Sequence, residues 1–192
     1  KIIDESPVRT EQLTIDEIRV LYSEVDSHPV ASMDQLSKYD PKGFIGFCFG
    51  RSMAAQLSAR QMGLAQESIL NLYILGDLRS GAQAQWRFHV TSLVRGPGGE
   101  LYAIDPVIGR PVPITEWIKE VRAIWDKGRK AKLYLTHGAV VLPDISQVPD
   151  LDKETGKTIV ELSFDPVGRE GFSLRKDLGD DVFELDATAT QK

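Results

Sequence analysis

The feature that most constrains the fold is a hairpin pattern between residues 86 and 105. From Trp86 to Val94, apolar residues alternate with polar ones, as in a half-buried β-strand. A second short apolar run, 101–105, follows the sequence Gly-Pro-Gly-Gly at 96–99, and this composition favours a tight turn. We therefore expect two neighbouring antiparallel strands in this part of the chain.

The length of the hairpin loop decides which side chains share a face of the sheet, because a one-residue shift moves every side chain to the other face. A three-residue loop at 97–99 pairs His89 with Val107 and makes His89 and Asp105 diagonal neighbours on one face, with backbones about 7 to 8 Å apart. A four-residue loop places them on opposite faces. Gly99, at the third loop position, suits the left-handed conformation that three-residue loops favour.

The other periodic segments predict an α+β fold. Thr14 and Glu17 have the spacing of a capping box, which predicts a helix over 14–26. Apolar residues at steps of three and four predict a second helix over 47–62, which Gly63 ends. The remaining predicted elements are strands at 70–75 and 132–135, a helix at 114–125 and one alternating segment at 158–164.

Cys48 is the only cysteine of the chain, so neither an internal disulfide nor a cysteine-based zinc cluster is possible. The three histidines have no metal-ligand spacing, and we expect no metal or cofactor. Cys48 follows a glycine-flanked turn and opens the helix over 47–62, where unpaired N–H groups and the helix dipole stabilise a thiolate or an oxyanion. A free cysteine is also commonly a small buried hydrophobe, and this segment alone leaves both interpretations open.

His89 and Asp105 complete a candidate catalytic set with Cys48. A thiol nucleophile needs a base, and that base needs an acceptor that orients it. The three-residue hairpin loop brings the histidine and the aspartate to one face, although either residue alone is also compatible with a structural role. His28 and His137 have no partnered acid nearby, and we expect both to be structural.

Several segments resemble bacterial protein-glutaminase, also called protein glutamine deamidase. They are 48–53 (CFGRSM), 72–79 (LYILGDLR), 86–94 (WRFHVTSLV), 104–106 (IDP) and 113–117 (PITEW), so that the resemblance spans about 44–126. It implies a papain-like or transglutaminase-like core, with the nucleophile at a helix N-terminus packed on an antiparallel sheet that bears His and Asp. The catalytic roles carry over to Cys48, His89 and Asp105. The family is richer in cysteine and disulfide-bonded, unlike this chain.

The resemblance implies a protein-glutamine deamidase, which hydrolyses the side-chain carboxamide of glutamine to glutamate and ammonia through a cysteine thioester. A transglutaminase or a cysteine protease with the same triad, and a noncatalytic binding module on this fold, are the alternatives. Trp86 and Tyr102 are candidate substrate-binding residues, with Arg51 and Asp77 as further candidates, although an aromatic residue in a strand is more often part of the core. The nucleophile assignment requires a sulfur that the substrate can reach.

Composition bounds the domain and its partners. With 192 residues, 42% of them hydrophobic, we expect one soluble domain over 1–192, divided into a helix and connector (1–43), a catalytic core (44–142) and an acidic extension (143–192). The net charge of −5 and the lack of a basic stripe disfavour nucleic acid, and no apolar run is long enough for a membrane span. We expect a monomer that meets a protein substrate presenting glutamine. The resemblance implies secretion or delivery as an effector, although the given sequence shows no signal-peptide pattern and a cytoplasmic location stays open.

Overall fold

The computed structural model describes residues 10–35, 38, 47–80, 84–138 and 183–185. Within these residues the chain is α+β, as expected, with a six-stranded sheet in the order β4-β3-β2-β1-β5-β6. All five strand pairings are antiparallel. The predicted strand at 158–164 lies outside the described residues. The elements are α1 Ile15–Asp26, α3 Cys48–Gln61, β1 Ile69–Ser80, β2 Ala84–Arg95, β3 Leu101–Ile104, β4 Val112–Pro113, α4 Ile114–Trp125, β5 Lys132–His137 and β6 Phe183–Leu185.

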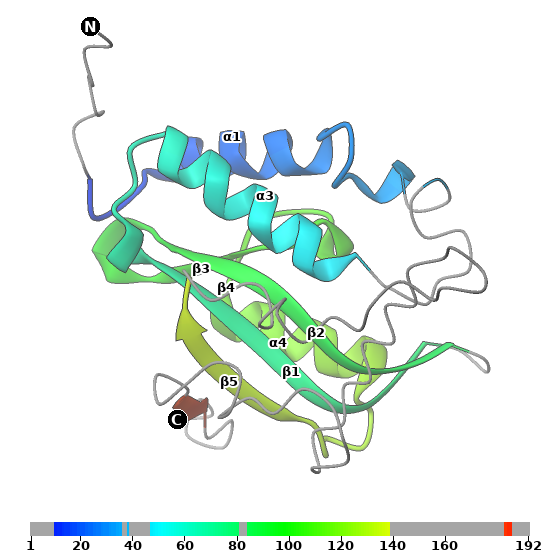
Figure 1. Cartoon of the computed structure of the whole chain (residues 1–192). Helices are drawn as coiled ribbons and strands as arrows, with labels where there is room; N and C mark the ends of the chain where they lie inside the picture. Colours follow the sequence, from blue (N-terminus) through cyan, green and yellow to red (C-terminus); the bar gives the residue numbers. More distant parts are fainter. Residues whose placement is uncertain (1–9, 36–37, 39–46, 81–83, 139–182, 186–192) are drawn as a thin grey trace, which may run out of the picture.

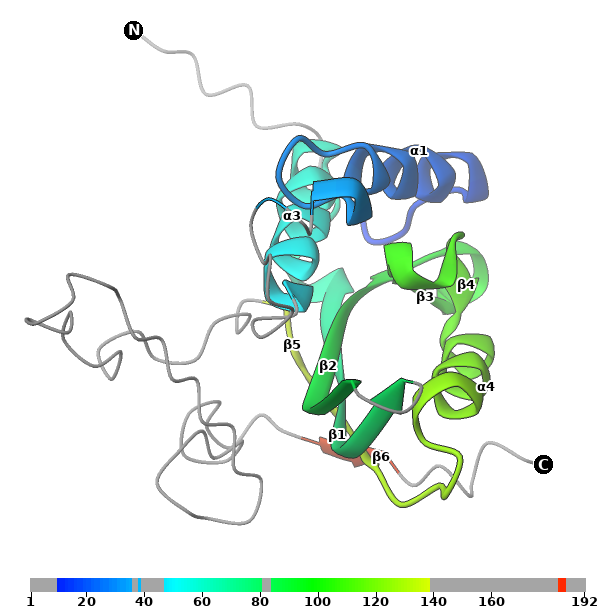
Figure 2. The ribbon, with the colours of Figure 1, turned by 90° about the vertical axis from the view of Figure 1, so that its right-hand side faces the viewer.

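The helices cover both faces of the sheet. Helices α1 and α3 pack together on one face, and α4 packs on the other (Figure 1). Figure 2 shows that the sheet curves around α4. Because successive side chains of a strand point to opposite faces, Leu72 and Ile74 of β1 join the core on the α4 side, whereas Tyr73 and Leu75 join the cluster beneath α3. The central strand is therefore buried on both faces.

The hairpin between β2 and β3 has the predicted three-residue loop. Its register pairs Ser92 with Ile104 and Arg95 with Leu101, and a 3-10 turn at Pro97–Gly99 closes it. Gly99 has a φ of 82°, in the left-handed region that glycine adopts at little cost. The predicted register is confirmed, and it places His89 and Asp105 on the same face of the sheet.

Strand β1 is longer than predicted and contains a bulge. Its register with β2 shifts between Leu75 and Leu78, and the two strands continue beyond this point as a hairpin that ends at Ser80. At Gly76 a Cβ atom would lie 2.9 Å from both Cα and Cβ of Ala131, so the bulge permits a close backbone approach that only glycine allows. A second difference is β6, which pairs with β5 although the sequence around it predicts loops.

A buried polar network joins α3 to the sheet. Ser52 Oγ lies 2.7 Å from Ser92 Oγ, and Gln56 Nε2 donates to Asn71 Oδ1 at 2.8 Å. Ser92 Oγ also donates to the backbone oxygen of Ser52 at 2.8 Å. Since buried polar groups are costly unless they are paired, these bonds favour one placement of α3 on the strands. The placement of α3 in turn determines where Cys48 lies.

Candidate active site

Cys48 is the first residue of α3. Phe47 precedes it in a left-handed conformation with φ 47°, and no side chain caps this end of the helix. The first backbone hydrogen bond of the helix runs from Arg51 N to Phe47 O at 3.2 Å, so the Cys48 N–H has no acceptor within the helix. The Cys48 residue is only 4% exposed. The sulfur is thus covered in the structure, whereas a nucleophile has to be reached by its substrate.

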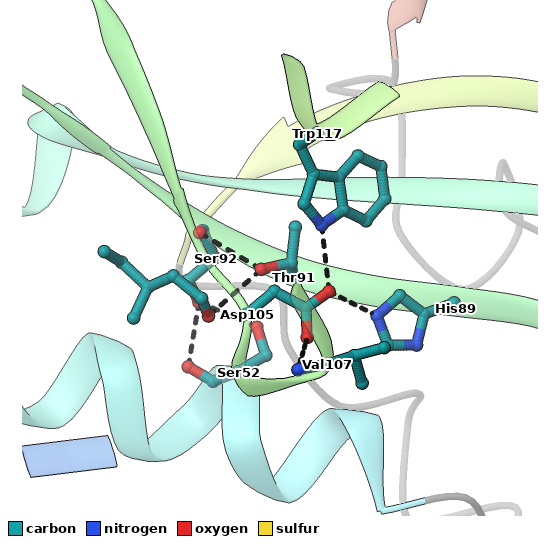
Figure 3. A network of polar contacts seen from close by, with 8 residues as sticks. Ser52, His89, Thr91, Ser92, Asp105, Val107 and Trp117 are labelled. Carbon is teal, nitrogen blue, oxygen red and sulfur yellow. Dashed lines mark hydrogen bonds and ion pairs between the residues drawn. The ribbon is translucent and has the colours of Figure 1, made fainter. Parts of the chain in front are cut away.

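His89 and Asp105 form a buried pair. His89 Nε2 lies 2.7 Å from Asp105 Oδ2, and the two residues are 4% and 3% exposed (Figure 3). The hairpin register brings the pair together, because Asp105 directly follows the last residue of β3 and begins the 3-10 turn Pro106–Ile108. The other carboxylate oxygen, Oδ1, accepts a hydrogen bond from Val107 N at 3.2 Å.

Helix α4 encloses the pair with two tryptophans. Trp117 Nε1 donates to Asp105 Oδ2 at 2.9 Å, and its ring is nearly parallel to that of His89, at 18° with centroids 6.0 Å apart. The ring of Trp125 meets His89 at a steeper angle of 65°, with centroids 4.8 Å apart. An imidazolium is attracted to an indole face at such a distance, so the stacked ring of Trp117 favours the charged form of His89.

Cys48 and His89 come from opposite faces of β2. Cys48 packs with Val90 on the face that α3 covers, whereas His89, the neighbour of Val90, points toward α4. The thiol of Cys48 is nevertheless close enough to the imidazole to contribute to the raised pKa of His89. Strand β3 pairs only with residues 92–95 of β2, so the edge of β2 beside His89 is not paired with any strand that the structure describes.

The electrostatics of the site favour an ionised pair. Burial alone would lower the pKa of His89, but the charge and hydrogen bond of Asp105, together with the hydrogen bond and charge of Cys48, raise it from 6.5 to about 9. Burial alone would raise the pKa of Asp105. The charge and hydrogen bond of His89, the hydrogen bond from Trp117 and the charge of Arg51 hold that pKa below its ordinary value. An imidazolium facing a carboxylate is therefore the expected state near neutral pH.

Other candidates from the sequence do not join this set. Tyr102 packs against the core beneath α1, and its hydroxyl donates to Glu100 Oε2 at 2.9 Å. Trp86 lies opposite Leu78 in β2, and its side chain is outside the described part of the structure. Tyr102 is therefore a partly buried residue that packs against this core, with its hydroxyl at the surface.

The charged candidates have different environments. Arg51 is 5% exposed in the first turns of α3, and its charge acts on Asp105. Asp77 lies at the bulge of β1 and forms an exposed ion pair with Arg79 at 2.8 Å. His28 Nδ1 accepts hydrogen bonds from two backbone N–H groups of the following turn, at 3.1 Å each, which is a structural role. Arg51 is therefore the charged candidate whose charge influences the buried His89–Asp105 pair.

The sequence did not identify the roles of Trp117 and Trp125. Their spacing with Val121 shows a buried stripe on the helix, and all three side chains are buried. Periodicity predicts that a side chain is buried, but it does not show which side chain on another element it contacts. Their contacts with His89 and Asp105 follow only from the docking of α4 on the sheet.

The described residues contain no group of three or more His, Cys, Asp or Glu side chains that could hold a metal ion. None of the helices described combines the length and the apolar character needed to cross a membrane.

Comparisons find similarity among solved structures. No protein-family model and no curated protein sequence matches the chain. A crystal structure of protein-glutaminase has a TM-score of 0.49 at 17% identity, with 72% of this chain and 80% of that chain covered. The NMR structure of protein-glutaminase from Chryseobacterium proteolyticum has a TM-score of 0.45 at 16% identity, with 70% and 77% covered.

A crystal structure of pro-protein-glutaminase has a TM-score of 0.49 at 18% identity and covers 72% of this chain. The similar region spans only 52% of that longer protein, or about half of its length. One fold supports many activities, so function has to be argued from the atoms of the site.

Proposed function

We propose that the chain is a cysteine amidohydrolase that deamidates glutamine side chains in proteins. The observation that carries the proposal is the buried His89–Asp105 pair, together with a buried cysteine at the start of a helix that contributes to the raised pKa of His89. A structural cysteine needs no such partners. Burying a charged pair is also costly, and perturbed ionisable groups cluster at functional sites.

The proposed reaction begins with a Cys48 thiolate and a His89 imidazolium that Asp105 orients. The sulfur attacks the carboxamide carbon, and the Cys48 backbone N–H donates to the oxyanion that forms. His89 then gives its proton to the departing ammonia, which leaves a thioester on Cys48. A water molecule loses a proton to His89, attacks the thioester and releases glutamate, and the proton on His89 restores the starting imidazolium as the thiolate departs.

Glutamine as the substrate rests on the motifs around the triad. The runs at 48–53, 86–94 and 104–106, which hold Cys48, His89 and Asp105, are the segments that resemble protein-glutaminase. The papain-like or transglutaminase-like core and the need for a protein substrate are part of the same proposal. Because the thioester does not determine its acceptor, transfer to an amine and cleavage of a peptide bond are alternatives with the same chemistry.

The burial of Cys48 and His89 has a consequence for this mechanism. With each residue 4% exposed, the groups over the sulfur have to move before a carboxamide can enter. Such a closed site also keeps water from the ion pair, which strengthens the attraction between its charges. We therefore expect turnover to include an opening step.

Casein, a glutamine-rich protein, provides the test. Intact mass and ammonia should be measured after incubation with the wild type and with Cys48→Ala, in the presence and absence of a fluorescent primary amine. Deamidation predicts ammonia release with the mass change of amide-to-acid conversion, no incorporated amine and no cleaved chain. Amine incorporation would identify a transglutaminase, and cleavage would identify a protease. Activity that survives in Cys48→Ala would exclude the nucleophile.

A noncatalytic binding module makes a different prediction. In such a protein Cys48 would react with iodoacetamide at pH 6 no faster than a free thiol, because thiolate is the reactive form. The proposed enzyme reacts faster at that pH, and His89→Ala abolishes the difference.

A further inference from the structure

Trp117 contacts both members of the buried pair. Its indole N–H donates to Asp105 Oδ2 at 2.9 Å, the same oxygen that lies 2.7 Å from His89 Nε2. Its ring also lies against the imidazole, and Figure 3 shows the indole nitrogen pointing at the shared oxygen. Trp117 is fully buried, with 0% exposure, so this hydrogen bond forms away from solvent.

A purely structural tryptophan would account for only part of this geometry. Trp117 belongs to the apolar core between α4 and the sheet, and a phenylalanine would fill much of the same space. A buried indole N–H usually finds a hydrogen-bond partner, and most acceptors in a core are uncharged. Here the acceptor is a buried carboxylate that already holds a histidine. Hydrogen bonds to charged groups are the stronger class.

The carboxylate plane is held at both ends. Val107 N donates to Oδ1 at 3.2 Å, and Trp117 Nε1 donates to Oδ2. Without the second donor, the carboxylate of Asp105 can rotate about its terminal torsion, which has broad wells. Rotation would move Oδ2 away from His89 Nε2. The imidazole would then lose the fixed orientation in which it interacts with Cys48.

We propose that Trp117 is a positioning residue of the catalytic set, with its N–H aiming Asp105 Oδ2 at His89 and its ring fixing the plane of the imidazole. This inference deepens the proposed function and rests on it. The indole of Trp117 thereby joins the thiol, imidazole and carboxylate that the sequence identifies, and its role is to orient the base.

Two variants separate the N–H from the ring. Trp117→Phe removes the N–H and part of the ring, whereas replacement of Trp117 by 3-benzothienylalanine removes the N–H and keeps the ring shape. Val121→Ala is the matched control, because Val121 is fully buried on the same helix and its aliphatic side chain cannot hydrogen-bond to the triad. All three proteins should be compared with the wild type for kcat, KM and the pH profile on a glutamine-containing protein.

Both Trp117 variants should lose about 10- to 100-fold in kcat with KM within about twofold, the size of one hydrogen bond to a charged group. The acid limb of the pH profile should move to higher pH, since the carboxylate loses a donor that lowers its pKa. Val121→Ala should lose stability and keep the kcat and pH profile of the wild type. A benzothienyl variant with wild-type kcat and acid limb, or a Val121→Ala protein that reproduces the Trp117 phenotype, would overturn the inference.

A readout without turnover keeps this inference distinct from the proposed function. In proton NMR, the N–H shared by His89 and Asp105 should give a downfield signal that disappears on acidification, when the carboxylate is protonated. The midpoint of this loss should lie at higher pH in both Trp117 variants. An unchanged midpoint would refute the role of Trp117 even in an active enzyme, whereas a shifted midpoint in a protein that does not release ammonia would support it and reject the deamidase.

Discussion

Replacing Asp105 by asparagine removes one charge and leaves the shape of the side chain. All three hydrogen-bond partners of the carboxylate are donors, namely the N–H groups of His89, Trp117 and Val107. An asparagine has one acceptor oxygen, so its NH2 group must face at least one of these donors. If the oxygen takes the Oδ1 position, the NH2 group faces His89 and stabilises a neutral ring with the wrong tautomer.

The size of the effect follows from the pKa of His89. Its rise from 6.5 to about 9 corresponds to about 3 kcal/mol in favour of the imidazolium, as an order of magnitude. Without the Asp105 charge, burial dominates and the ring is neutral near pH 7.5. We expect ammonia release at pH 7.5 to fall about 100- to 1,000-fold, which is the same free energy expressed as a rate.

The stability change should depend on pH in a defined direction. The folded-state pKa of His89 lies above the unfolded value. The contribution of His89 to the free energy of unfolding is therefore fully present below pH 6.5 and is lost as the pH rises through about 9. The stabilisation that comes from the lowered pKa of Asp105 is present at pH values above the ordinary pKa of 3.8 and is lost as the pH falls below it. The free energy of unfolding of the wild type should therefore exceed that of Asp105→Asn by about 3 kcal/mol near pH 6, and by much less above pH 9.

Urea unfolding at pH 6 and pH 10 measures this difference, and Asp126→Asn provides the control. Asp126 is also buried and accepts two backbone N–H groups, from Lys130 at 2.9 Å and Ala131 at 3.1 Å. Its variant should be destabilised similarly at both pH values and should release ammonia at the wild-type rate. An Asp105→Asn protein with an equal stability loss at pH 6 and pH 10, or with more than a tenth of wild-type activity, would refute the reasoning.

Three further predictions concern packing. Asn71→Leu should lower the free energy of unfolding by about 1–3 kcal/mol in urea titrations, because buried donors on α3 lose their acceptor; an unchanged value would contradict the network. Gly76→Ala should cost about 1–3 kcal/mol through its clash with Ala131, whereas Gly128→Ala, where a Cβ meets only ordinary contacts, should be nearly neutral; equal effects would contradict the close approach. Tyr102→Phe should keep kcat and KM within about twofold, and a large loss of turnover would return Tyr102 to the site.

The sequence predicted those elements whose signals are local. The capping box at Thr14 and Glu17 is formed with both of its hydrogen bonds, and the helix over 114–125 has the predicted bounds. Loop chemistry at 97–99 favoured the register of β2 and β3 that the structure has, in which His89 and Asp105 share a face. Turn type and strand alternation depend on short segments of the chain, so they can be predicted from a single sequence.

Features that depend on how distant elements pack together could not be predicted from the sequence. The bulge at Gly76 reflects the approach of Ala131, and β6 depends on pairing with β5. The contact of Trp117 with Asp105 requires α4 to lie on the face of the sheet that bears His89 and Asp105. The sequence also left open whether Cys48 is buried, because the start of a helix can be open or covered, depending on what packs over it.

The most direct test of the central claim is detection of the acyl-enzyme. The wild type should be mixed with a glutamine-containing peptide, quenched in acid during turnover and digested. The mass of the fragment that contains Cys48 should then be measured by mass spectrometry. We expect a fragment heavier by the mass of the peptide minus ammonia in the wild type and no adduct in Cys48→Ala. The adduct would also show that the covered sulfur becomes accessible. Ammonia release during steady turnover, with acyl groups trapped on another residue, would contradict the account.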